Sequence, residues 1–199
     1  MKKVVSTDSI NFDYLSRHII SALDLINKER KNILLGGFTS AIIEFLGRCI
    51  RSPQKEDSKD NFYKFIEDYL RKYDERYSKY KELLYRDFRC GAAHTIMPKG
   101  TILLSFDEND KRRHLKTIKD STKNSFHLKI YSPKLIEDLK NAIEKFIDKA
   151  KKDHSLGENY KRTISYLQGQ LQKDIDTLIP EEDRENAIVE KVIHDTYRA

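Results

Sequence analysis

The sequence has few of the features that mark disulfide-rich, membrane-spanning and secreted proteins. Its 2 cysteines, Cys49 and Cys90, are too few for a disulfide framework, and we expect both to be thiols. No apolar run approaches the roughly 18 residues that a membrane span needs. The two N-terminal lysines are not followed by the apolar region of a signal peptide. We therefore expect a cytoplasmic protein that does not use a membrane.

The motifs of several large enzyme classes are also missing. The chain has no glycine-rich phosphate loop, no HExxH and no GxSxG, so it gives no support to an NTPase, a zinc protease or an α/β-hydrolase. We find no internal repeat and no low-complexity tract. These absences lead us to expect neither a metal ion nor an organic cofactor.

Charge, in contrast, is abundant and unevenly placed. Between Lys111 and Lys129 seven lysines and arginines accompany one acid, Asp120, so this basic segment (111–129) alone has the net charge of +6 that the whole chain has. Such a patch favours a polyanionic partner, of which nucleic acid is the simplest. A solvated, lysine-rich loop would give the same count.

Apolar residues recur at helical spacing over most of the chain. The pattern predicts helices over 10–29, from about Lys31 to Cys49, over 62–88, from Pro133 to about residue 150, over 159–178 and over 182–197. A helix covering all of 62–88 would be unusually long, so we expect a break near residues 72–76. A stripe of tyrosines in this stretch is interpreted as packing, with the hydroxyls reaching water, rather than as a base-stacking platform: Tyr69, Tyr73, Tyr77 and Tyr80.

Three short β-branched or aromatic runs interrupt the helices, at 101–106, 113–118 and 125–130, and they predict a small antiparallel sheet. The expected fold is thus mainly α. It is a single domain over 1–199, formed by a helical bundle with a basic β insertion at about 101–130 and a C-terminal helical extension over 155–199.

The passage "ELLYRDFRCGAAHTIMPKG", residues 82–100, contains the candidate catalytic pair, Arg89 and His94. A histidine both accepts and gives a proton near neutral pH, and an arginine grips a phosphate through two N–H donors. Together they suggest RNA cleavage without a metal ion. On a regular helix the two side chains would point about 140° apart. Cleavage needs one group that takes a proton and another that gives one, and a single histidine supplies only one of them. A symmetric dimer would supply the second.

"RCGAAH" fits the R-x4-6-H motif of the HEPN family (higher eukaryotes and prokaryotes nucleotide-binding domains), and "LLYRDFRCGAAHTIMPKG" resembles the family's motif helix. The resemblance covers mainly residues 10–100 and 133–150. It implies an all-helical, usually dimeric bundle. Many members are metal-independent endoribonucleases in toxin–antitoxin, phage-defence and RNA-processing systems. For this chain, the resemblance implies that Arg89 is the phosphate-binding arginine and His94 the catalytic histidine. An antitoxin protein is a further candidate partner.

The alternatives give the same residues other roles. Cys90 stands where active members usually have a polar residue, which favours a non-catalytic module that binds RNA, a nucleotide or a protein. In a purely structural interpretation, Arg89 pairs with an acid such as Asp87, and His94 caps a helix. A Cys90–His94 nucleophile or metal site lacks a second ligand pair and a third orienting group.

Further basic side chains are candidates for contacts with an RNA strand. They lie one turn before Arg89, in the turn after His94, and within the basic segment: Arg86, Lys99, Arg112, Arg113, His114 and, less directly, His127.

Overall fold

The computed structural model describes residues 12–51, 57–89 and 100–178. These residues form a mainly helical protein with one small sheet, as predicted. The helical elements before the sheet are η1 (Tyr14–Ile19), α1 (Ile20–Lys28), α2 (Asn32–Arg51), α3 (Ser58–Asp68), η2 (Leu70–Lys72), α4 (Arg76–Lys79), α5 (Lys81–Leu83) and η3 (Leu84–Arg89). The remaining elements are β1 (Ile102–Ser105), η4 (Glu108–Arg113), β2 (Lys116–Asp120), β3 (Ser125–Tyr131), α7 (Ser132–Lys152) and α8 (His154–Leu178).

The core of the bundle lies between the apolar stripes of its long helices. The stripe predicted after Pro133 is the buried face of α7, and Leu139, Ile143 and Phe146 are fully buried in it. On α2, Leu35 and Leu46 are also fully buried. This side-by-side packing of amphipathic helices follows from the apolar spacing in the sequence.

α2 differs from the expectation that no segment could span a membrane. Among the described residues it is the one helix that meets that test, because it has 20 residues and its most apolar window of 18 residues has a mean hydropathy of 1.6. The core helix of a bundle passes the same test, and half of the apolar window of α2 is buried inside the protein. Its apolar composition is accounted for by its contacts with α3, α7 and α8.

The long helical stretch after residue 57 is broken, as predicted. α3 ends at Asp68, and the short elements η2, α4, α5 and η3 follow. Two of the four tyrosines in this stretch, Tyr69 and Tyr77, are almost fully buried, so the packing interpretation holds for them. The hydroxyl of Tyr77 does not reach water as expected, because it donates to the buried carboxylate of Asp138 at 3.0 Å.

The sheet is mixed rather than wholly antiparallel. Its strand order is β1-β3-β2, with β2 antiparallel and β1 parallel to β3. The chain reverses direction twice after β1, at η4 and at the turn between β2 and β3, so β3 returns in the direction of β1 and inserts beside it. β2 begins at Lys116, later than the predicted 113, because the preceding residues form η4.

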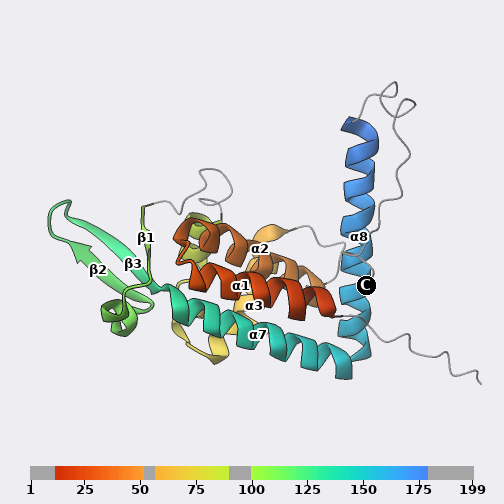
Figure 1. The fold of residues 1–199 in the computed structure, drawn as a ribbon, viewed down its shortest axis with the longest axis horizontal. Helices are drawn as coiled ribbons and strands as arrows, with labels where there is room; N and C mark the ends of the chain where they lie inside the picture. Colours follow the sequence, from red (N-terminus) through yellow and green to blue (C-terminus); the bar gives the residue numbers. More distant parts are fainter. Residues whose placement is uncertain (1–11, 52–56, 90–99, 179–199) are drawn as a thin grey trace, which may run out of the picture.

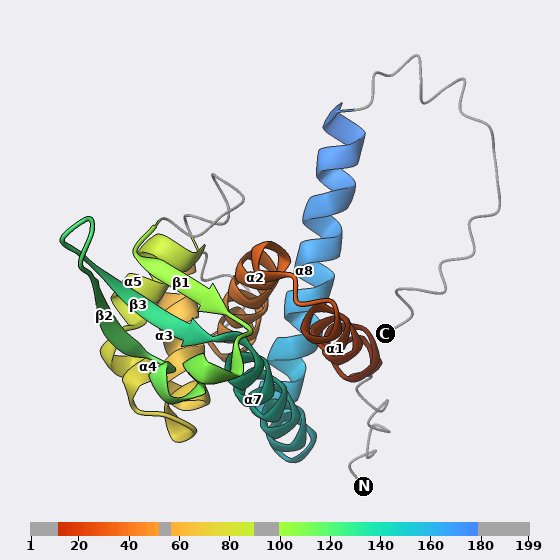
Figure 2. The same cartoon turned by 60° about the vertical axis from the view of Figure 1, so that its left-hand side comes forward.

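The sheet and α8 lie at opposite ends of the bundle (Figures 1 and 2). The β2–β3 hairpin extends outward at one end, and β3 continues into α7 with no loop between Tyr131 and Ser132. α8 runs across the other end. It begins earlier than the predicted 159, because the carboxylate of Asp153 accepts a hydrogen bond from the backbone N–H of Leu156 at 3.2 Å and caps the helix. The predicted helix at 182–197 lies outside the described residues.

Candidate functional site

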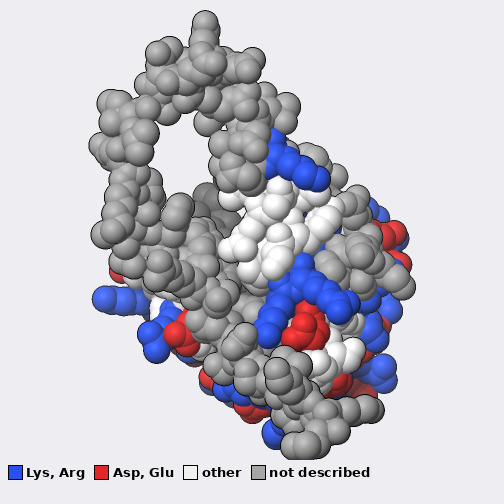
Figure 3. All heavy atoms as spheres, turned by 90° about the vertical axis from the view of Figure 1, so that its right-hand side faces the viewer, with Lys and Arg blue, Asp and Glu red and all other residues white. Residues whose placement is uncertain are grey.

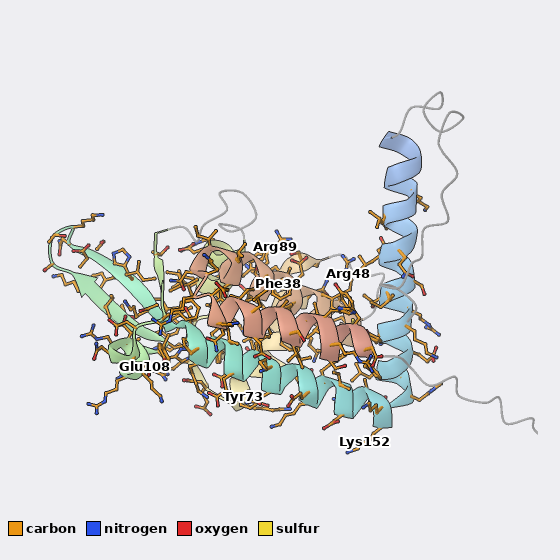
Figure 4. The ribbon with its side chains drawn as sticks, viewed as in Figure 1. Phe38, Arg48, Tyr73, Arg89, Glu108 and Lys152 are labelled. Carbon is orange, nitrogen blue, oxygen red and sulfur yellow. The ribbon has the colours of Figure 1, made fainter. Side chains whose placement is uncertain are left out.

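Arg89 is the last residue of η3 and lies against α2. Its Nε donates a hydrogen bond to Oε2 of Glu44, at the middle of α2, at 2.8 Å. The two side chains are 29% and 20% exposed, so the pair lies at the edge of the core. Figure 4 shows Arg89 on the same upper side of the bundle as Arg48, which follows Glu44 by one turn of α2.

The ion pair gives Arg89 a defined position. A guanidinium carries five donors in a planar fork, which lets one group hold it while another approaches as ligand. Since α2 is a long core helix, Glu44 fixes the arginine relative to the bundle rather than to a loop. The ion pair with Glu44 therefore holds the positive charge of Arg89 at a fixed position on the bundle.

η3 is a π-helix, and helices of this kind occur frequently at functional sites. The expected angle of about 140° between Arg89 and His94 assumed a regular α-helix. His94, Cys90 and Lys99 lie outside the described residues, so their roles remain predictions.

Arg86 and Asp87 form a second ion pair beside the first. The Arg86 Nε lies 2.8 Å from Oδ1 of Asp87, and this carboxylate is buried while the Arg86 side chain is 61% exposed. The Thr101 hydroxyl also donates to Asp87. Asp87 thus joins η3 to the start of β1. The structural alternative paired Arg89 with an acid such as Asp87, but the acid that holds Arg89 here is Glu44.

The basic segment is exposed over most of its length. Arg112 and Arg113 are exposed on η4, and Arg113 lies 3.3 Å from the buried carboxylate of Asp110. Lys129 lies 2.7 Å from the same carboxylate, and together the two cations lower the pKa of Asp110, with the hydrogen bond from Lys129 as the main cause. At the opposite end of the molecule, the face that contains α8 shows basic and acidic side chains interspersed (Figure 3).

His114 is not an exposed member of the basic segment, contrary to the prediction that it contacts RNA. It is 4% exposed, and its Nε2 lies 3.2 Å from the Tyr77 hydroxyl. Burial disfavours the charged ring and lowers its pKa to about 4. A neutral, buried imidazole is part of the core, and we remove His114 from the candidate RNA contacts.

His127, in contrast, is partly exposed on β3. Its Nδ1 lies 2.5 Å from the carbonyl oxygen of Gly100, and its Nε2 lies 2.8 Å from the Ser125 hydroxyl. The carbonyl can only accept, so Nδ1 donates to it, and in the neutral ring Nε2 accepts from the Ser125 hydroxyl. These two contacts hold the ring beside the start of β1.

Glu44 is the site residue that the sequence interpretation missed. It stands among Ile42, Ile43, Phe45 and Leu46, within the most apolar of the helices that the structure describes. A charged residue in such a setting is nearly always paired, so an acid within an apolar run was the available signal. Its partner is 45 residues away in sequence, which periodicity alone does not indicate.

Comparison of the chain with protein-family models, with curated proteins and with solved structures finds no match.

Proposed function

We propose that the protein is an HEPN-type endoribonuclease that cuts RNA without a metal ion. The observation that carries the proposal is the placement of Arg89, which ends a helical run, begins the R-x4-H motif and is held by Glu44 of a core helix. We further propose that it acts as a cytoplasmic homodimer, in toxin–antitoxin, phage-defence or stress-response systems. The mainly helical bundle supports the resemblance on which this rests.

The proposed reaction is attack of a ribose 2′-oxygen on the adjacent phosphorus. The neutral imidazole of His94 takes the 2′ proton, and the P–O5′ bond breaks as the new P–O2′ bond forms. The departing 5′-oxygen receives a proton from the imidazolium of His94 in the partner protomer. Arg89 stabilises the negative charge that develops on the phosphoryl oxygens. The products are a 2′,3′-cyclic phosphate and a 5′-hydroxyl.

A second candidate is a non-catalytic module that binds RNA, a nucleotide or a protein through the same residues. Two observations favour it: Cys90 follows the arginine, and the Glu44 carboxylate already neutralises part of the Arg89 charge. In this case a phosphate would bind beside the ion pair without being cleaved.

Cleavage of a fluorescent single-stranded RNA in excess EDTA tests the proposal. We expect Arg89→Ala and His94→Ala each to reduce the rate by about 100-fold or more. Arg17→Ala is the matched control, since it removes the same charge from an exposed side chain on η1 that is 75% exposed. Cleavage that is unchanged in both motif variants would exclude the mechanism. Binding without cleavage by the native protein would establish the second candidate instead.

A further inference from the structure

Phe126 is a large apolar side chain exposed on the β2–β3 hairpin. It is 62% exposed, and the Nζ of Lys119 lies 5.9 Å from the centre of its ring. Lys119 and Phe126 are directly opposite each other in the antiparallel pair, so their side chains share one face of the sheet. An aromatic ring with a cation beside it is therefore built into the hairpin.

A second aromatic–cation pair continues the same face. Thr117 precedes Lys119 by two residues and so lies on its side of β2. The Thr117 hydroxyl lies 3.4 Å from that of Tyr80, and the Nζ of Lys79 lies 5.2 Å from the Tyr80 ring centre. We call this surface the stacking face and define it by five residues: Lys79, Tyr80, Thr117, Lys119 and Phe126.

Packing does not account for the exposed phenylalanine. Leu128, two residues further along β3 on the same face, is 2% exposed, so the sheet leaves the core between Leu128 and Phe126. Burial of a phenylalanine is worth about 1.5–3 kcal/mol, and Phe126 forgoes most of it. The lysines of β2 could protect an edge strand from pairing with other chains. An exposed phenylalanine beside that edge has the opposite effect, so edge protection does not explain the pair.

The charge around Phe126 limits the class of ligand. Lys119 lies beside the ring, Lys123 is in the turn of the same hairpin, and the one acid of the basic segment, Asp120, accepts hydrogen bonds within that turn. Its Oδ1 accepts hydrogen bonds from the backbone N–H of Thr122 at 2.8 Å and from the Thr122 hydroxyl at 2.6 Å. The exposed ring of Phe126 with lysines beside it matches the alternation of a base and its flanking phosphates in a single strand, whereas the Tyr80 ring is partly buried against the core. A duplex hides its base faces and would leave the Phe126 ring without a role.

We propose that the stacking face binds single-stranded RNA, with Phe126 stacked on a base and Lys119 and Lys79 beside the flanking phosphates. The inference rests on the proposed function for the choice of RNA. Its contacts are separate from Arg89 and His94, however, and they name the surface that holds the substrate strand outside the cleavage site.

Equilibrium binding of a fluorescein-labelled 2′-O-methyl oligouridine tests the contact independently of cleavage, because the blocked 2′-oxygen cannot attack. We expect Phe126→Ala to weaken binding by about 5- to 150-fold, the range of one base–aromatic stack. Lys119→Ala should reduce the slope of log affinity against log salt by about 0.7, the value for one phosphate of a single strand. Leu171→Ala is the matched control, since it truncates a side chain of similar exposure, 61%, on α8.

A spectroscopic probe reports stacking directly. The chain contains no tryptophan, so Phe126→Trp creates a single indole at the proposed contact. We expect the oligonucleotide to quench its emission and to bind with near-native affinity. Leu171→Trp should show no quenching. Binding that persists in Phe126→Ala, or an indole that is not quenched, would overturn the stacking contact.

The outcomes also separate the two proposals. Loss of binding in Phe126→Ala, together with a native protein that never cuts RNA, would support the stacking face and reject the nuclease. Cleavage by the native protein, together with unchanged binding in Phe126→Ala, would support the nuclease and reject the stacking face. A native protein that fails to bind the oligonucleotide would overturn the stacking face as an RNA site.

Discussion

Gly47 of α2 contacts the backbone carbonyl of Asn61 in α3 so closely that no larger residue fits. A Cβ added to Gly47 would lie 1.7 Å from that carbonyl oxygen, and the obstructing atom is backbone, which cannot rotate away. The two helices can cross this closely because Gly47 has only a hydrogen atom where other residues have a side chain. Glu44 lies on the same helix, α2, so the position of Glu44 depends on this packing.

We therefore expect Gly47→Ala to destabilise the protein, by about 3 kcal/mol or more, although alanine is the better helix former. Gly169 of α8 is the matched control, because a methyl group added there would meet nothing within 4 Å, and Gly169→Ala should add about 0.5–1 kcal/mol. Thermal unfolding followed by circular dichroism measures both. Equal melting temperatures for the two variants would contradict the close contact.

The Glu44–Arg89 pair leads to an expectation for RNA binding. Glu44→Gln keeps the shape of the side chain but removes a negative charge beside the proposed phosphate site. We expect it to tighten binding of a non-cleavable RNA by a few-fold, the effect of about 1 kcal/mol or less.

Glu137→Gln on α7 serves as its control, since it removes an equal charge from a side chain that is 62% exposed. Titration at two salt concentrations checks both variants. Weaker binding by Glu44→Gln would mean that the carboxylate is needed to hold Arg89 in place.

Burial of His114 predicts how stability changes with pH. Its pKa falls from 6.5 to about 4 on folding, mainly through loss of hydration, so the unfolded chain binds more protons between these values. Its contribution is intact above pH 6.5 and is lost as the pH falls towards 4, by about 3 kcal/mol in total.

The neighbours of His114 modify this loss. Asp74 opposes the shift in the pKa of His114, and Arg76 and Lys134 add to it. The nearby Asp138 has a raised pKa, also through burial, so acid relieves its cost and offsets part of the loss. Urea unfolding across this pH window should therefore show a flatter profile for His114→Gln than for the native protein. Parallel profiles would show that His114 is hydrated.

The thiol of Cys49 should be unreactive in the folded protein. It is fully buried, and burial raises the pKa of its thiol to about 12. In a Cys90→Ser variant, where it is the remaining thiol, we expect reaction with a disulfide reagent to be slow and to accelerate on addition of denaturant. Fast labelling without denaturant would show that α2 separates from its neighbours in the native state.

The long helices could be read from the sequence because each buries one stripe, and burial of a stripe is what apolar spacing records. The break near residues 72–76 was predicted for a different reason, because an uninterrupted helix over 62–88 would be unusually long, and the structure has one between η2 and α4. What the spacing could not show is how distant elements meet. The pairing of Arg89 with Glu44 and the parallel pairing of β1 with β3 are both such meetings.

The error at His114 has a local cause. Arg112 and Arg113 before it suggested a continuous basic surface, but η4 ends at Arg113, and Leu115 has a φ of 51°, a left-handed conformation. The chain therefore turns sharply, and both His114 and Leu115 enter the core. Few leucines adopt this conformation, so composition alone gave no indication of the turn.

The uninterrupted passage from β3 into α7 has a mechanical consequence. An RNA strand that pulls on the hairpin would pull along β3, which becomes at Ser132 the helix α7, and the apolar face of α7 is buried in the core. Because no flexible loop separates β3 from α7, force applied at the tip of the hairpin would be transmitted directly to the helical core. The hairpin would therefore move as a rigid extension of the bundle.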